Sequence, residues 1–124
     1  MSSDNNKKKR YIIELYRDRK GKSQVEKFFY ELMRQDKNAA VKLYAKLDII
    51  TQHGLEFANS RHIEEEIWEF KISQNRILYF IYSQNKIILL NGFIKKTQKT
   101  PPDIIAEAKK FKNEYLSRGE CGND

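Results

Sequence analysis

The stretch from residue 66 to residue 94 holds three successive segments rich in β-branched and aromatic residues: EIWEFKIS, NRILYFIYS and NKIILLNGFI. The tripeptide Ser-Gln-Asn occurs at both junctions, at residues 73–75 and 83–85. Apolar segments of this length, joined by short polar links, are typical of β-hairpins. The stretch therefore predicts a three-stranded antiparallel meander, against which the rest of the chain must pack.

Before this meander, the pattern predicts one strand and two helices. The segment YIIELY, residues 11–16, has the composition of a strand. Ser23 opens a capping-box pattern that begins a first helix, and Asn38 can cap a second helix that stops at Gly54. The link between the helices is very short, which predicts an antiparallel helical hairpin. Residues 55–66 follow no regular period and are interpreted as a loop.

After the meander, the pattern predicts a final helix from a cap at Thr100 to about Arg118. Pro101 and Pro102 suit its first positions. The resulting order, β-α-α-β-β-β-α, indicates an α+β fold in which two N-terminal helices and a C-terminal helix pack on a small antiparallel sheet. We expect helices to cover one face of the sheet and to leave the other face open to a partner.

The length of 124 residues is that of one domain. We expect this single domain to span residues 11–118. The polar and basic residues 1–10 predict a disordered N-terminal tail, and residues 119–124 predict a flexible C-terminal tail.

The composition excludes several kinds of site. A single cysteine, Cys121, cannot form an internal disulfide, and the two histidines are isolated from other metal-binding side chains. We therefore expect no metal and no other cofactor. The first residues lack the apolar segment of a secretory signal, and the longest apolar run, ILYFIY, is too short to span a membrane. These features predict a cytoplasmic protein with no membrane partner.

The net charge of +7 fits a partner that carries phosphate, such as a nucleic acid, and equally an acidic protein. Seven lysines lie between residues 86 and 112, several of them just before the final predicted helix. Lysines ahead of a helix start can strengthen an anion site. They can also form an ordinary solvated basic face, so spacing by itself leaves both interpretations open.

Strand direction adds a more specific prediction about four basic residues. Lys71 and Arg76 flank the first Ser-Gln-Asn turn, and Lys95 and Lys96 end the last strand. If the last strand pairs with the strand that Arg76 begins, all four lie at the same end of the sheet. Such a cluster would bind phosphate. The alternative is that these charges only protect the end and edge of the sheet.

Alternation along the last strand places Asn91, Phe93 and Lys95 on one face. Most aromatic residues of the meander are expected in the core. Phe93, next to the lysines, is the residue that we expect to be exposed and able to stack on a base.

Two segments, EIWEFKISQNRILYFIY and IILLNGFIKKTQKTPPDIIAEA, together resemble the HigB branch of the RelE/ParE-like toxins, a group that includes phage-derived relatives. The resemblance is close over the second half of the chain. In the first half it extends to the order of elements, a strand followed by a helix pair. It implies a compact RelE-like fold and a type II toxin of a toxin–antitoxin system.

Toxins of this branch enter the ribosomal decoding site and cut messenger RNA without a metal. The RNA 2′-hydroxyl attacks its own phosphodiester, and the leaving 5′-oxygen gains a proton. The partners implied by the resemblance are the ribosome, messenger RNA and a HigA-like helix-turn-helix antitoxin.

The matching segments also imply a catalytic set. Arg76 and Lys95 are expected to stabilise the phosphate charge, and Lys71 or Lys96 to assist proton transfer. Lys71 stands where relatives carry arginine, so it keeps the charge and loses the bidentate geometry of a guanidinium.

Three further residues, Asn91, Phe93 and Lys99, are expected to bind substrate. Asn91 stands where many relatives carry histidine, and asparagine cannot act as a base at neutral pH. Two other functions stay open: a non-catalytic member that binds RNA or its partner only, and a gyrase-directed toxin of the ParE type. The KKTQKTP segment, residues 95–101, favours the RNA-cutting branch by analogy.

Overall fold

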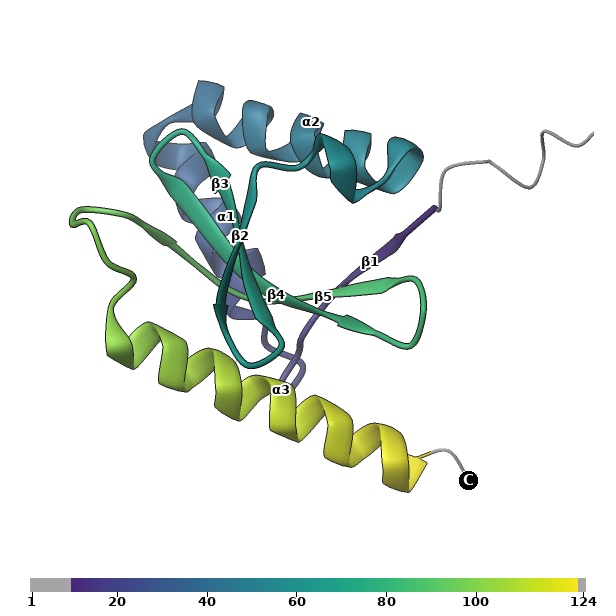
Figure 1. Ribbon diagram of the computed structural model, residues 1–124. Coiled ribbons are helices and arrows are strands. Elements are labelled where there is room, and N and C mark those ends of the chain that lie inside the picture. Colours follow the sequence, from purple (N-terminus) through teal and green to yellow (C-terminus); the bar gives the residue numbers. More distant parts are fainter. Residues whose placement is uncertain (1–9, 123–124) are drawn as a thin grey trace, which may run out of the picture.

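A computed structural model of the chain describes residues 10–122, and over this range it contains three α-helices and one five-stranded sheet (Figure 1). In chain order the elements are β1 (Ile12–Leu15), α1 (Gln24–Gln35), α2 (Lys37–His53), the 3-10 helix η2 (Leu55–Phe57), β2 (Ser60–Glu64), β3 (Ile67–Ile72), β4 (Asn75–Tyr82), β5 (Lys86–Ile94) and α3 (Pro102–Gly122). The predicted α+β class is confirmed. Residues 1–9 and 123–124 lie outside the described range, so the disorder predicted for the N-terminal tail stays a prediction. Of the predicted C-terminal tail, residues 119–122 belong to α3. Helix α3 continues past the predicted end near Arg118.

The sheet has the strand order β1-β5-β4-β3-β2, and the predicted meander forms its centre. β3 pairs with β4, and β4 with β5, in antiparallel registers. Ser73 and Ser83, the first residues of the two Ser-Gln-Asn turns, have φ angles of 60° and 62°. Tight hairpin turns require this left-handed backbone. The meander and both of its turns are therefore confirmed.

The prediction of an entirely antiparallel sheet is wrong at one edge. β1 pairs in parallel with β5, with Ile13 opposite Ile87, so the sheet is mixed. Parallel neighbours need a long connection between them, and here α1, α2 and three strands separate β1 from β5. The direction of β1 thus depends on the path of the seventy residues between the two strands, about which the pattern of β1 itself contains no information.

Residues 55–66, interpreted as a loop, contain η2 and the strand β2. β2 pairs antiparallel with β3, with Ser60 opposite Phe70, and Glu65 makes the tight turn between them at a φ of 53°. β2 lies at the edge of the sheet and exposes most of its side chains. It therefore lacks the apolar alternation from which strands are predicted.

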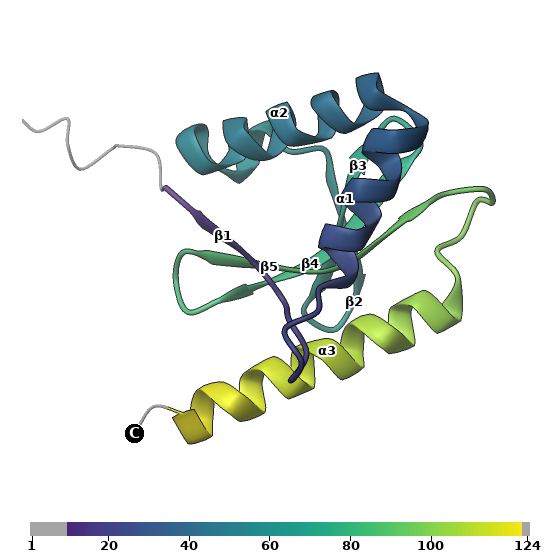
Figure 2. The ribbon, with the colours of Figure 1, turned by 180° about the vertical axis from the view of Figure 1, so that it is seen from behind.

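Helices cover both faces of the sheet. Two opposite views place α1 and α2 on one face and α3 on the other (Figures 1 and 2). The expectation of an open face is therefore wrong. The first core lies under α1 and α2, and its buried side chains include Phe28, Leu43, Ile50, Phe70, Ile77, Tyr79, Ile87 and Leu89. The second lies under α3 and buries Tyr16, Ile67, Leu78, Phe80, Ile88, Leu90 and Ala108.

Side chains determine where α1 and α2 begin. Ser23 Oγ accepts a hydrogen bond from the Glu26 N–H at 3.0 Å, which confirms the predicted cap of α1. The cap of α2 is Asp36 and not Asn38, because the Asp36 carboxylate accepts from the Ala39 N–H at 3.1 Å. Asp36 also ends α1, so the two helices meet at a corner and diverge (Figure 2). The predicted antiparallel hairpin is therefore wrong.

The first turn of α1 also holds the far end of β5. β1 pairs with β5 only as far as Leu89, while β5 continues toward Lys95. Beyond β1, the Gln24 amide takes the place of a strand: it donates to the Gly92 carbonyl at 2.9 Å and accepts from the Gly92 N–H at 2.7 Å. A Cβ on Gly92 would lie 2.7 Å from the Phe28 ring, so this close approach requires glycine.

Candidate functional site

An open polar pocket of about 480 Å³ lies at the end of the sheet where the β3–β4 turn meets the segment after β5. We call it the basic pocket, and it is lined by Arg61, Lys71, Gln74, Arg76, Lys95, Lys96, Thr97 and Gln98. Five of these eight side chains carry a positive charge, and no carboxylate is among them. A concave surface of one sign of charge concentrates ligands of the opposite sign, phosphates among them.

Strand register brings the four predicted catalytic residues together in this pocket. Lys71 lies directly opposite Arg76 in the β3–β4 pair. The Lys95 N–H donates to the Gln74 carbonyl at 2.8 Å, which carries the pairing past the end of β5, and Lys96 follows it. The prediction that all four lie at one end of the sheet is confirmed. Their catalytic roles stay predictions.

Arg76 is the most constrained of the four. Its side chain is buried, and its Nη1 donates to the Ser73 carbonyl at 2.6 Å and to the Asn75 carbonyl at 3.1 Å. Its Nε has no hydrogen-bond partner among the described residues, and the nearest carboxylate oxygen, Glu69 Oε1, lies 3.8 Å away. A guanidinium held in this way loses little conformational freedom on binding an anion, because its position is already fixed.

Arg61 was not anticipated as a member of the pocket. It lies on β2, in the segment interpreted as a loop, and stands opposite Glu69 in the β2–β3 register. Its Nη2 is 3.3 Å from Glu69 Oε1. The sequence contained no local signal for this hairpin, because its turn is formed by Glu65 and Glu66, which are not typical turn residues.

Lys95 differs from the other lysines in its environment. Partial burial lowers its pKa, and three neighbouring cations, Arg61, Arg76 and Lys71, lower it further. The carboxylate of Glu69 opposes this effect. A lysine whose pKa moves toward neutrality exchanges its proton more readily, so it is better suited to proton transfer.

The lowered pKa of Lys95 predicts a pH-dependent affinity for RNA. As the pH rises through this pKa, the pocket loses one positive charge and its affinity for phosphate falls. Because the pKa of Lys95 is lowered, this fall is expected at a lower pH than for a lysine with the ordinary pKa. Fluorescence anisotropy with a short labelled RNA, from about pH 7 to about pH 10, measures this decline. Lys95→Arg, which stays charged, is expected to remove it. An unchanged pH profile in Lys95→Arg would contradict the prediction.

The family model of the phage-derived Gp49-like proteins (DUF891) matches residues 30–113, which is more than half of the chain. The chain belongs to this family. The matched range contains every residue that lines the basic pocket, and the family is a toxin-like one. A search of curated proteins found no match to the chain.

Asn91, a predicted substrate-binding residue, lies in the interior of this Gp49-like protein. Its side chain is fully buried. Its Nδ2 donates to the Ile104 carbonyl at 3.1 Å and to Glu107 Oε1 at 2.8 Å, both on α3. Phe93 packs on the same α3 side, so Asn91 and Phe93 share a face as predicted. Asn91 is not among the residues that line the basic pocket, and its contacts instead join β5 to α3.

Replacing Asn91 with alanine is expected to lower the free energy of unfolding by about 1–3 kcal/mol, because the Glu107 carboxylate and the Ile104 carbonyl lose their donor. RNA affinity of the folded fraction is expected to stay within about twofold of the wild type. Urea denaturation and RNA anisotropy measure the two quantities. A loss of affinity without a loss of stability would place Asn91 at the substrate instead.

The remaining predicted substrate-binding residues lie near the basic pocket and do not line it. Lys99 is exposed in the segment before α3, where its carbonyl accepts from Thr97 Oγ1 at 3.0 Å. Phe93 is only partly exposed, because it packs against the core beneath α3. The expectation of an exposed Phe93 is therefore wrong. Trp68 is instead the exposed aromatic residue of the meander.

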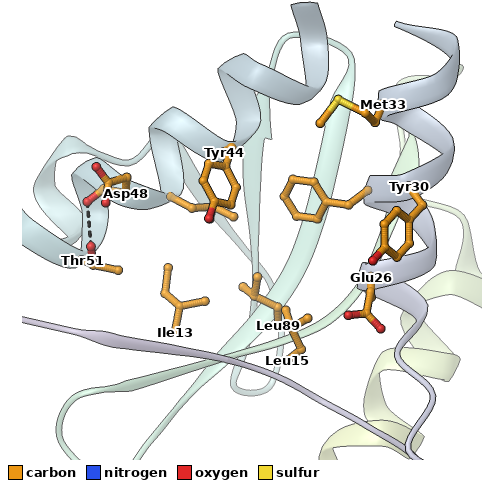
Figure 3. A pocket seen from close by; sticks show the side chains of 11 residues that line it. Ile13, Leu15, Glu26, Tyr30, Met33, Tyr44, Asp48, Thr51 and Leu89 are labelled. Carbon is orange, nitrogen blue, oxygen red and sulfur yellow. Dashed lines mark hydrogen bonds between the residues drawn. The ribbon is translucent and has the colours of Figure 1, made fainter. Parts of the chain in front are cut away.

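A second concave surface has the opposite chemistry. The groove between α1, α2 and β1 measures about 530 Å³ and is lined by Ile13, Leu15, Glu26, Phe29, Tyr30, Met33, Tyr44, Leu47, Asp48, Thr51 and Leu89. Tyr30 and Tyr44 come from different helices, and Ile13, Leu15 and Leu89 lie below them (Figure 3). Its two charged lining residues, Glu26 and Asp48, are both acidic. Since carboxylates repel phosphate, this groove is unsuited to RNA.

Residues 10–122 contain no group of three or more histidine, cysteine or acidic side chains placed to hold a metal ion. None of the helices in that range combines the length and the apolar character needed to cross a membrane.

Proposed function

We propose that this Gp49-like protein is a HigB-type toxin of a type II toxin–antitoxin system and cuts messenger RNA on the ribosome. The observation that supports this proposal most strongly is the meeting of Arg61, Lys71, Arg76, Lys95 and Lys96 in one pocket. The resemblance of the pocket-forming segments to HigB toxins supplies the substrate. As a consequence, the protein would act in the cytoplasm, where ribosomes are.

The reaction is an internal transesterification. The 2′-oxygen loses its proton and forms a bond to phosphorus, the bond from phosphorus to the 5′-oxygen breaks, and the 5′-oxygen gains a proton. The products are a 2′,3′-cyclic phosphate and a 5′-hydroxyl. Negative charge accumulates on the phosphate oxygens in between, so positioned cations lower the barrier.

Arg76 is suited to the fixed part of this task, because two carbonyls hold its guanidinium before any substrate arrives. Preorganised charge stabilises a transition state without the cost of reorganisation. Lys71 and Lys96, both exposed, add positive charge to the pocket.

The lowered pKa of Lys95 favours a different division of roles from the one the resemblance implies. We propose Lys95, in place of Lys71 or Lys96, as the proton donor to the leaving 5′-oxygen. A donor must lose its proton in the transition state, and a depressed pKa makes that transfer less costly.

Induction in bacterial cells, followed by mapping of messenger RNA 5′ ends, tests the function. Growth arrest with new 5′ ends inside translated frames is the expected result. Arg76→Ala is expected to abolish both effects, while the matched control Arg34→Ala, an exposed arginine on α1, retains them. Arrest with DNA damage and no new 5′ ends would indicate a gyrase-directed toxin. The absence of arrest, with RNA binding intact, would indicate a non-catalytic binding protein.

The proposed partners are the ribosome and a HigA-like helix-turn-helix antitoxin. Co-expression with a helix-turn-helix protein encoded next to this chain is expected to relieve growth arrest and to yield a stable complex on purification. Failure of every such neighbour to bind would contradict a toxin–antitoxin pairing.

A further inference from the structure

A fully buried carboxylate lies directly behind the basic pocket. Glu69, on β3, has no exposed side-chain surface. Its Oε2 accepts from Thr100 Oγ1 at 2.8 Å, and its Oε1 accepts from Arg61 Nη2 at 3.3 Å. Arg76 Nε lies 3.8 Å from the same Oε1. One carboxylate therefore contacts a residue of β2, a residue of β4 and the residue two positions before α3.

Such a group requires a reason, because burying a carboxylate is costly unless charges and donors surround it. Glu69 meets that requirement: two guanidinium groups and a hydroxyl face it. The Thr100 hydroxyl also accepts from Arg61 Nη2 at 3.3 Å, so Arg61 is held by two partners at once. These contacts explain why Thr100, expected to cap α3, does not do so. The helix begins instead from the Pro101 carbonyl, which accepts from the Ile104 and Ile105 N–H groups.

We propose that Glu69 is the positioning residue of the basic pocket, which holds Arg61 and Arg76 in fixed places, and that Arg61 is a further phosphate-binding residue. The proposal deepens the proposed function, on which its cleavage readout rests. Arg61 is half-exposed and reaches the pocket from the edge strand, while Arg76 is buried at its floor. Two arginines on opposite sides of one carboxylate can contact neighbouring phosphates of an RNA strand.

A purely electrostatic role for Glu69 predicts a different effect of its removal on RNA binding and cleavage. Its negative charge weakens the attraction of the pocket for RNA, so its removal would then only tighten binding and leave cleavage intact. A purely structural role forecasts that affinity and cleavage fall together with the folded fraction. A positioning role predicts different effects on affinity and cleavage: the affinity for RNA is retained, and the rate at which the bound RNA is cleaved falls.

Glu69→Gln is the sharpest variant, because it preserves shape and leaves a carbonyl oxygen for the Thr100 hydroxyl while removing the charge that holds the arginines. RNA affinity is expected to be unchanged or up to about fivefold tighter. The single-turnover cleavage rate on programmed ribosomes is expected to fall about 10- to 100-fold. Thr100→Val, which removes the hydroxyl and no charge, is expected to lower the rate less. An unchanged rate in Glu69→Gln, or a loss of rate that only follows the unfolded fraction, overturns the proposal.

A second measurement does not depend on RNA cleavage. The Arg76 Nε–H signal in the nitrogen-15 NMR spectrum, assigned by its loss in Arg76→Lys, is expected to be sharp and slow to exchange in the wild type. In Glu69→Gln it is expected to broaden and to exchange faster. An unchanged signal in Glu69→Gln overturns the positioning role, whether or not the wild type cleaves RNA. Conversely, a changed signal in a protein that never cleaves RNA refutes the proposed function and leaves the positioning role standing.

The role of Arg61 is tested with inorganic phosphate as the probe. Phosphate is expected to shift the Arg61 Nε–H signal in the wild type, and Arg61→Ala is expected to weaken RNA binding about three- to tenfold without loss of folding. If phosphate shifts only the Arg76 and lysine signals, Arg61 is not a phosphate-binding residue.

Discussion

Replacing Arg76 with alanine is expected to lower the rate of messenger RNA cleavage by about 10²- to 10³-fold, the usual effect of removing one preorganised donor from a developing anion. Arg76 is buried at the floor of the basic pocket, and the Ser73 and Asn75 carbonyls hold it. These two hydrogen bonds hold the guanidinium in place before substrate arrives. Primer extension on a programmed ribosome, under single-turnover conditions, measures the rate.

Two variants make this test specific. Arg76→Lys keeps the charge and loses the planar fork, so an intermediate rate is expected. Arg34→Ala removes an exposed arginine from α1 and is expected to leave the rate within about twofold of the wild type. A wild-type rate in Arg76→Ala, in protein shown to be folded, would remove Arg76 from the catalytic set.

The second large effect concerns stability. Phe70→Ala is expected to lower the free energy of unfolding by about 3–5 kcal/mol, because truncation leaves a cavity that rigid neighbours cannot fill. Phe70 lies under α1 and α2, where its ring stacks on that of Tyr79 at 4.0 Å between centroids. The Tyr79 hydroxyl in turn bonds Ser60 of β2 at 2.7 Å, so the lost ring lies between the centre of the sheet and its edge. Chemical denaturation measures the change.

Trp68→Ala is the matched control for Phe70→Ala. The two residues are two positions apart on β3, so they share a face of the strand. Trp68 is 38% exposed and Phe70 is 1% exposed. Although Trp68 has the larger side chain, Trp68→Ala is therefore expected to lower the free energy of unfolding by only about 1 kcal/mol. Part of this loss comes from the contact with the His62 ring. A loss in Phe70→Ala no larger than the loss in Trp68→Ala would contradict the prediction.

Arg76→Ala and Phe70→Ala test different parts of the protein: the first tests the basic pocket, and the second tests the core under α1 and α2. The basic pocket gathers charges of one sign at the end of the sheet, and its exposed lysines, Lys71 and Lys96, are not expected to stabilise the fold. The aromatic stack lies on the opposite side of the sheet, under α1 and α2. Variants of these lysines can therefore be studied in folded protein. Variants of Glu69, Arg61 and Arg76 need a parallel measurement of stability, because the buried carboxylate of Glu69 depends on the two guanidinium groups beside it.

Much of the fold could be predicted because the relevant signals are local. The Ser-Gln-Asn turns, the Ser23 cap and the Gly54 stop each depend on residues within one turn of the chain. The basic cluster could also be predicted, since two hairpin turns fix the relative positions of Lys71, Arg76 and Lys95 without reference to the rest of the molecule.

The covering of both faces of the sheet is a non-local feature that the sequence does indicate. The runs ILYFIY and IILL are continuous and not alternating, as expected for strands that are buried on both faces. The structure buries β4 and β5 in this way, between α1 and α2 on one side and α3 on the other. The continuous apolar runs therefore indicated that both faces of the sheet are covered, in contrast to the expectation of an open face.

The sequence by itself determined the meander, the helices and the gathering of four basic residues at one end, because backbone turns and periodic burial act over a few residues. Only the tertiary structure decided the parallel direction of β1, the strand β2 and the burial of Asn91 beneath α3. It also brought Arg61 and Thr100, 39 positions apart, onto the carboxylate of Glu69. These contacts join elements that meet only when the whole sheet and α3 are packed, and the residue pattern of each element contains no information about its distant partner.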